Sequence, residues 1–457
     1  MTTLIIIIFV IGYLAITLEH NLKLDKLIPA LAMMAVSWAL ISFGIDGFDQ
    51  WFDSGKHALV KGFSTFGHDA KMHLAEETLL HHLGKTSEIL FFLMGAMTIV
   101  EIINYFDGFA TFKSYIKTKK KSNLLWIFAA LAFVLSAIID NLTATIVLIS
   151  ILQKIISDRN TRLWFAGLII IAANAGGAWS PIGDVTTTML WIGDKVSAAY
   201  LLKYLFVPSL LTMLVPVFIA SFLPAFKGEI EAVEETSTPS KHGAIMLYLG
   251  LAGIVFVPIF KTVTHLPPYV GMMLSLSVVC VFAEIYSRSK FSVGSAMAGD
   301  GAEELDEPGH TSPVHHSLSK IEMPSILFFF GILMAVAALE SLGLLFIGAE
   351  ALQTAIPDSD VVVMLLGIGS AVVDNVPLVA ASMGMFSEGL DHPLWHFVAF
   401  SAGTGGSMLI IGSAAGVVAM GMEKIDFFWY FKKISWLALV GFLVGSGAFM
   451  MVRMLLA

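Results

Sequence analysis

The chain has 457 residues, of which 57% are hydrophobic and only 13% are charged, with a formal net charge of −9 and a mean hydropathy of +0.83. This composition excludes an ordinary soluble globule and indicates a polytopic helical membrane protein. The long apolar runs do not alternate with polar residues, which excludes the strands of an outer-membrane barrel. The single cysteine, Cys280, excludes intrachain disulfides and cysteine-based metal clusters.

Apolar segments long enough to enter a bilayer recur along the whole chain. The first half contains segments at 3–20, 27–45, 88–107, a long unit 122–158, 163–193 and 200–226. A polar linker at 228–242 separates it from segments at 243–260, 269–287, 324–345, 361–389, 394–422 and 427–456. We therefore predict a first repeat at 1–227 and a second at 243–457. The first segment lacks a basic n-region, so we expect a retained span rather than a removed signal peptide.

Three sequence matches in the same order, at nearly constant offset, indicate an internal duplication. The run Ile89-Leu90-Phe91-Phe92 recurs as Ile326-Leu327-Phe328-Phe329, and Asp140-Asn141 recurs as Asp374-Asn375. A glycine-rich run at 176–180 aligns loosely with the run at 403–407.

Flanking charges predict how the two halves are oriented. Lysines and arginines flank the first Asp-Asn unit on both sides, whereas acidic residues flank the second. By the positive-inside rule, both ends of the first unit face the cytoplasm and both ends of the second face outward. Each unit is then a re-entrant helical hairpin, the second repeat is inverted relative to the first, and the N-terminus is external (periplasmic). This is the usual plan of a secondary transporter, whose site lies near the midplane.

The two predicted hairpin tips place acids at membrane depth. A charge there costs roughly 2.5–3.5 kcal/mol on insertion scales, so two such residues suggest a function. Asp140, Asn141 and Thr143 at the first tip, and Asp374 and Asn375 at the second, offer hard oxygen ligands suited to Na⁺ or Li⁺, and a carboxylate can alternatively hold a proton. The structural alternative is that each Asp only caps the following helix.

A glycine-rich break in each half supplies the second candidate element. The first contains Asn174, Pro181 and Asp184, followed by Thr186 and Thr187, and the second contains Ser407 and Ser413 without an acid. Glycine and proline interrupt a helix and expose carbonyl groups. Close helix packing through small residues is the alternative, which accounts for the glycines but not for Asn174 and Asp184.

The paired tips with their glycine-rich breaks resemble the ion transporter superfamily, which includes divalent-anion/sodium symporters and arsenite permeases. Aspartate before the tip asparagine, together with the run Asn-Ala-Gly-Gly-Ala-Trp-Ser-Pro-Ile-Gly-Asp at 174–184, is most similar to the NhaD sodium/proton antiporters. The resemblance implies a homodimer in a bacterial inner membrane, a scaffold domain with a moving transport domain, and exchange of Na⁺ or Li⁺ for H⁺. It assigns ion or proton binding to Asp140, Asn141, Thr143, Asn174, Asp184, Thr186, Thr187, Ser370, Asp374, Asn375 and Ser407.

The residues alone favour the same mechanism, because carboxylates that bind either Na⁺ or protons make occupancy exclusive. A carboxylate symporter or arsenite permease shares the predicted fold, but the acids repel anions unless cations neutralise them. An intramembrane aspartyl protease also needs two membrane acids and is the remote enzymatic alternative. We expect a transporter rather than an enzyme, with no cofactor and no nucleic-acid partner.

Two further features leave alternatives open. Glu101 and Glu340 lie in equivalent spans and suit either packing or a proton path. The external segment 46–87 is rich in histidine and suits an interfacial amphipathic helix, a pH sensor or a metal site.

Overall fold

The computed structural model describes residues 1–17, 19–53, 58–113, 118–230, 241–297, 312–372 and 375–456. In this part of the chain almost all regular structure is helical, and the only strands are the short antiparallel pair β1 (Phe52–Asp53) and β2 (Ala58–Leu59). Eight of the described helices are long and apolar enough to cross a membrane. The prediction of an all-α polytopic membrane protein is confirmed.

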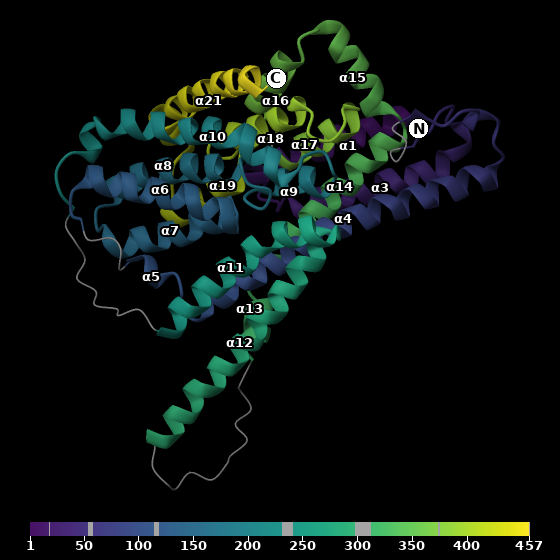
Figure 1. Ribbon diagram of the computed structural model, residues 1–457. Helices are drawn as coiled ribbons and strands as arrows, with labels where there is room; N and C mark the ends of the chain where they lie inside the picture. The colour runs from purple at the N-terminus through teal and green to yellow at the C-terminus, as the bar shows by residue number, and fades with distance from the viewer. Residues whose placement is uncertain are drawn as a thin grey trace.

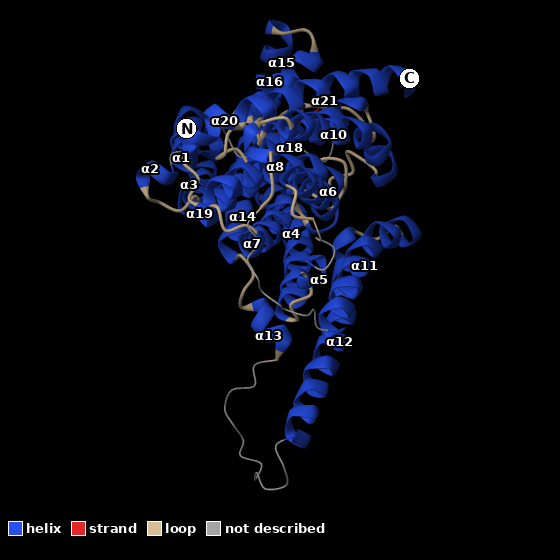
Figure 2. Ribbon diagram, turned by 90° about the vertical axis from the view of Figure 1, so that its left-hand side faces the viewer, coloured by secondary structure: helices blue, strands red, loops and turns tan. Residues whose placement is uncertain are grey.

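The helices of the first half are α1 (Thr2–Thr17), α2 (Glu19–Leu22), α3 (Leu27–Gly44), α4 (His68–Tyr105), α5 (Ala110–Lys113), α6 (Lys121–Ile139), α7 (Asn141–Ile155), α8 (Arg159–Gly177), α9 (Val185–Ile192) and α10 (Ala198–Ser221). Those of the second half are α11 (Lys241–Thr264), α12 (Pro268–Met297), α13 (Pro313–Leu318), α14 (Met323–Ser341), α15 (Leu344–Ala355), α16 (Ser359–Gly369), α17 (Asn375–Met385), α18 (Pro393–Gly405), α19 (Ala414–Glu423), α20 (Phe427–Lys433) and α21 (Ser435–Leu456). Helices α6 to α10 and α16 to α21 form the main body, from which α11 and α12 extend as a pair (Figures 1 and 2).

Large apolar side chains on several membrane helices face outward. Phe43 on α3, Val263 on α11 and Leu455 on α21 are 83%, 73% and 83% exposed. Such exposure is unfavourable in water but natural in hydrocarbon. The outer surfaces of these helices are therefore those of a membrane protein.

The first Asp-Asn unit forms a helical hairpin. Helix α8 runs parallel to α6, because Lys121 Nζ donates to Thr161 Oγ1 at 3.3 Å near their starts and Ser136 Oγ donates to the Ala173 carbonyl at 2.5 Å near their ends. Helix α7 ends directly before α8 begins, so its end returns to the start of α6. Asp140 lies between the two arms, as predicted.

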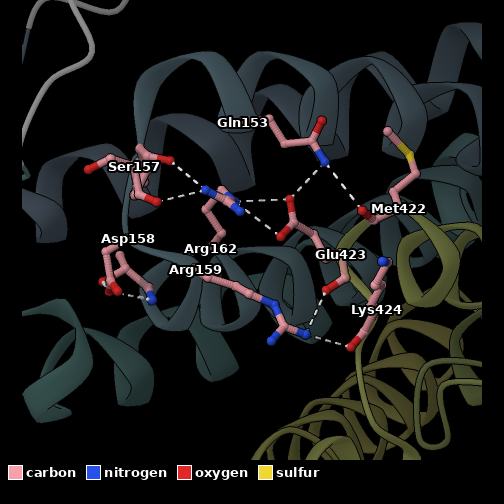
Figure 3. A network of polar contacts seen from close by, with 10 residues as sticks. Gln153, Ser157, Asp158, Arg159, Arg162, Met422, Glu423 and Lys424 are labelled. Atoms are coloured by element: carbon pink, nitrogen blue, oxygen red, sulfur yellow. Dashed lines mark hydrogen bonds and ion pairs between the residues drawn. The ribbon is translucent and has the colours of Figure 1, made fainter.

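The contacts of the helix ends define two ends of the body. At the Arg162 end, the turn between α7 and α8 meets the end of α19, where Arg162 Nε lies 3.1 Å from both Glu423 carboxylate oxygens and Gln153 Nε2 donates to Glu423 Oε1 at 2.9 Å (Figure 3). At the Lys195 end, the segment after α9 meets the segment before α18, where the Asp391 N–H donates to the Lys195 carbonyl at 2.9 Å. Helices α8 and α9 thus run from the Arg162 end to the Lys195 end, and α18 and α19 run in the opposite direction.

One element differs from the prediction. The segment 46–87 is not separate from the span that begins at 88, because a single helix, α4, covers 68–105. Gly84 is the one glycine before the apolar part of this helix, and no proline interrupts it. His68, His73, His81 and His82 lie on α4, whereas His57 lies outside the described residues, and no metal-binding group of three or more His, Cys, Asp or Glu occurs among those described.

The predicted linker is described only at its ends. Residues 231–240 lie outside the described part of the chain, and α11 begins at Lys241. Before this gap, the Ile230 N–H donates to the Lys119 carbonyl at 2.9 Å and the Lys121 N–H donates to the Gly228 carbonyl at 3.0 Å. The start of the linker is therefore fixed beside the start of α6.

Candidate ion-binding site

Asp140 caps the second arm of the first hairpin. Its Oδ1 accepts from the Thr143 N–H at 2.8 Å and its Oδ2 from Thr143 Oγ1 at 2.9 Å. Asp140 has a φ of +77°, which is rare for residues other than glycine and is found where surrounding contacts stabilise it. The capping role that the sequence suggested is confirmed, and Asp140 also lines a narrow cavity together with Asp184.

Asp184 is the acceptor that joins the two hairpin tips. Asn141 Nδ2 donates to its Oδ2 at 2.8 Å, and Asn375 Nδ2 approaches the same oxygen at 3.3 Å. The other carboxylate oxygen, Oδ1, accepts from the N–H and the hydroxyl of Thr186, both at 2.8 Å, which caps α9. Asp184 is only 2% exposed. Amides from both halves of the chain therefore converge on one buried carboxylate.

Asn174 extends this cluster to the second glycine-rich break. Its Oδ1 accepts from Asn141 Nδ2 at 2.9 Å, and its Nδ2 donates to Ser407 Oγ and to Ser413 Oγ, each at 2.9 Å. Asn174 is fully buried. The predicted residues Asn141, Asn174, Asp184, Thr186, Asn375 and Ser407 are thus brought together.

The glycines of the breaks allow the broken helices to touch the hairpins. A Cβ atom at Gly176 would collide with the backbone of Phe133 on α6, and one at Gly405 would collide with the Gly367 carbonyl on α16. The packing explanation therefore holds for these two glycines. Close packing does not exclude a polar site, because the same close approach brings Asn174 and Asp184 to the tip of the first hairpin.

The remaining predicted residues lie outside this hydrogen-bonded cluster or cannot be placed. Thr187 Oγ1 donates to the Asp184 carbonyl at 2.9 Å, so it stabilises the first turn of α9. Ser370 Oγ lies 2.8 and 3.0 Å from the Gly367 and Ala402 carbonyl oxygens, and sharing its one hydrogen between them links α16 to α18. Asp374 lies outside the described residues.

Glu101 and Glu340 lie near opposite ends of the body. Glu101 on α4 lines a cavity with residues of α7 that include Lys154, which lies at the Arg162 end. Glu340 on α14 lies against Gly384 on α17, next to the Lys195 end. Lys195 itself lies in the segment between α9 and α10, where burial lowers its pKa while Glu340 and Glu388 oppose this shift.

Two residues of the cluster are not among the predicted site residues. Ser413 caps α19 by accepting from the Gly416 N–H at 3.2 Å, which is the position that Asp184 holds at α9. Tyr430 is fully buried, and its hydroxyl donates to the Ser407 carbonyl at 2.8 Å. The sequence contained a signal for Ser413, since it follows its glycine-rich break as Asp184 follows the first, but none for Tyr430.

The chemistry of the cluster is that of a hard, oxygen-rich site. The groups that donate to Asp184 in the bonds named above are amides, a hydroxyl and a backbone N–H. Carboxylate, amide and hydroxyl oxygens suit an alkali cation, and a carboxylate can alternatively hold a proton. The arrangement fits a site that holds a monovalent cation or a proton.

The comparisons with known proteins agree with this chemistry. The protein-family model described as citrate transporter matches residues 7–395. Two relatives come from Arabidopsis thaliana. Sodium/proton antiporter 1 is 39% identical over 98% of this chain and 72% of the relative, and sodium/proton antiporter 2 is 36% identical over 98% of this chain and 99% of the relative. The Na(+)/H(+) antiporter NhaD of Vibrio cholerae is 33% identical over 91% of this chain and 84% of the relative. The chain therefore belongs to the NhaD-type sodium/proton antiporters, within the transporter family that the citrate transporter model describes.

Proposed function

We propose that this protein exchanges Na⁺ or Li⁺ for H⁺ across its membrane by alternating access. One observation carries the proposal: a single buried carboxylate, Asp184, accepts hydrogen bonds from Asn141 and Asn375, the asparagines of both hairpin tips. Related proteins are named for sodium and protons, the two ions that such a carboxylate can bind in turn.

Exclusive occupancy provides the coupling. A proton on Asp184 removes the negative charge that attracts Na⁺, and bound Na⁺ makes protonation unfavourable. Asp140 lines the same narrow cavity and adds a second carboxylate. If the site faces each side of the membrane in turn, and changes side only while it holds Na⁺ or a proton, the two ions move in opposite directions.

The proposed architecture is the inverted repeat predicted from the sequence, with halves at 1–227 and 243–457 joined by the linker 228–242. The opposite directions of α8–α9 and α18–α19 support it. The flanking charges further favour a cytoplasmic Arg162 end and an external N-terminus. A homodimer and a bacterial inner membrane follow from the family resemblance, and the relatives include both plant and bacterial proteins.

An ion-selective assay tests the proposed function. Inside-out vesicles that contain the protein are given a preset pH gradient, followed by NaCl, LiCl, KCl or sodium succinate. We expect NaCl and LiCl to collapse the gradient. A response to sodium succinate without a response to NaCl would instead identify the sodium-coupled anion symporter that the family also suggests. No response to NaCl or LiCl at any pH would contradict the proposal.

A further inference from the structure

A cavity of about 330 Å³ lies between α4 and α7 at the Arg162 end. Thr143, Ser150 and Lys154 line it from α7, and Glu101 and Asn104 line it from α4. The spacing of the three α7 residues places them on one face of the helix. The cavity therefore follows α7 for about 16 Å, from the hairpin tip to the end of the helix.

The inner end of this cavity reaches the acid at the tip. Thr143, which lines the cavity, donates from its hydroxyl to Asp140 Oδ2. Asp140 in turn lines the narrow cavity that also contains Asp184. At the outer end the lining is charged, with Lys154, Lys320 and Glu322. A hydrated ion would therefore meet polar side chains at the inner end, in the middle and at the outer end of this cavity, with apolar residues such as Ile146 and Val147 between them.

The equivalent place in the second half is packed. Helix α14 lies against α17 near the Lys195 end, and a Cβ atom at Gly384 would lie 3.3 Å from Glu340 Cγ and Cδ and 2.8 Å from Leu345 Cδ1. Gly384 and Ser150 are at equivalent positions, because each follows the tip asparagine of its hairpin at the same spacing. Glu340 likewise lies in the span equivalent to that of Glu101. Among the described residues, the two corresponding interfaces thus differ: a cavity lies between α4 and α7, whereas Glu340 and Gly384 are in contact between α14 and α17.

We propose that the α4–α7 cavity is the entrance for a hydrated monovalent cation at the Arg162 end, and that the Glu340–Gly384 contact is its closed counterpart. In the opposite state, Glu101 packs against Ser150, and α14 separates from α17. This inference rests on the proposed exchange by alternating access. Both entrances cannot be open together, because ions would then cross without being exchanged.

Paired cysteines test this directly, because the only native cysteine, Cys280, can be replaced by serine. Both cysteine pairs are introduced into the Cys280→Ser chain. The pair Glu340→Cys and Gly384→Cys should form a disulfide in the present state, in which these two residues are in contact. The pair Glu101→Cys and Ser150→Cys should form a disulfide only in the opposite state. In a chain that carries all four cysteines, intact mass after oxidation and alkylation should show one disulfide, and not two, in each molecule, and peptide mapping should identify each disulfide as one pair or the other. Molecules with both disulfides would overturn the proposal.

The matched control pair is Gly167→Cys with Ile434→Cys. A Cβ atom at Gly167 would lie 2.6 Å from Ile434 Cγ1, and neither residue touches the two interfaces, so this disulfide should form together with either of the others. If the four-cysteine chain does not fold, the single Ser150→Cys variant still tests the entrance. It should react with a membrane-impermeant thiol reagent added at the Arg162 end, and no reaction from either side would contradict the proposed entrance.

Failure of the inference can be separated from failure of the proposed function. The Cys280→Ser chain without added cysteines is assayed for Na⁺-dependent proton movement in the same vesicles. If it exchanges the ions but the Glu101→Cys and Ser150→Cys pair never links, the gating proposal is wrong and the function stands. If the disulfides exclude each other but no ion is exchanged, the function is wrong.

Discussion

At the scale of single residues, Asp184 organises the candidate site more than the hairpin tips themselves. The sequence indicated Asp140 and Asp374 through their repetition, and it indicated Asp184 as a third acid beside a helix break. It did not indicate that Asn141 and Asn375 both reach Asp184, because spacing along the chain does not give distances across two interrupted helices. Ser370 shows the same limit, since its bonds to the Gly367 and Ala402 carbonyls depend on the packing of α16 on α18.

Asp158 allows a prediction about pH at this scale. Thr161 donates to its Oδ2 from the hydroxyl at 2.6 Å and from the backbone at 2.9 Å, and these bonds hold the pKa of Asp158 below its usual range. A carboxyl group whose pKa is lower in the folded than in the unfolded chain stabilises the fold at pH values above its unfolded pKa, which is near 3.9 for a free Asp. This stabilisation is lost as the pH falls through the folded-state pKa.

We therefore expect Asp158→Ala to lower the free energy of unfolding in detergent by about 1 kcal/mol at pH 7, as for other lost helix caps. The difference from the natural chain should shrink in acid. Asp158→Asn is the matched control, because asparagine caps equally well but does not titrate. Its stability should stay close to that of the natural chain at pH 7. An unchanged gap between the Ala variant and the natural chain at low pH would contradict this explanation.

At the scale of helices, the hairpin and the glycine-rich breaks were predictable, whereas helix ends and lengths were less so. Charged flanks and a buried Asp-Asn pair indicated the α6–α7 hairpin, and its tip lies at Asp140 as expected. The continuous α4 was missed because the change from a polar, histidine-rich sequence to an apolar one looked like the start of a new element. Backbone hydrogen bonding continues across such a change when no proline interrupts the helix.

The ion pair between Arg162 and Glu423 connects helices from both halves, as Figure 3 shows. The Glu423 side chain is 1% exposed and that of Arg162 is 19% exposed. We expect Glu423→Gln to lower the free energy of unfolding by about 2 kcal/mol, less than the roughly 3–5 kcal/mol typical for a broken, fully buried pair. The loss is smaller because Arg162 still donates to the Ile156 and Ser157 carbonyls.

A double-mutant cycle checks this contact. Glu423→Gln, Arg162→Gln and the double variant are unfolded chemically in the same detergent. A coupling energy of about 1 kcal/mol or more between the two sites supports a stabilising ion pair. Strictly additive effects would show that the pair contributes nothing beyond its separate hydrogen bonds.

At the scale of the whole molecule, the two glycine-rich breaks differ in charge. Ser413 stands at the position equivalent to Asp184, so one broken helix provides the acid and the other provides hydroxyl groups. The sequence predicted this asymmetry, because the second glycine-rich run contains no acid. It could not predict that a cavity lies between α4 and α7, because the shape of an interface depends on how the side chains of two helices pack and not on the sequence of either helix alone.

In the proposed mechanism, sodium and protons compete for one site that contains Asp184. The most direct test adds NaCl to the purified protein in weakly buffered detergent solution and follows the pH, with choline chloride as the ionic-strength control. We expect NaCl and LiCl to release protons, choline chloride to release none, and Asp184→Asn to reduce the release greatly. Sodium binding without proton release at any pH, or full release from the Asp184→Asn variant, would contradict it.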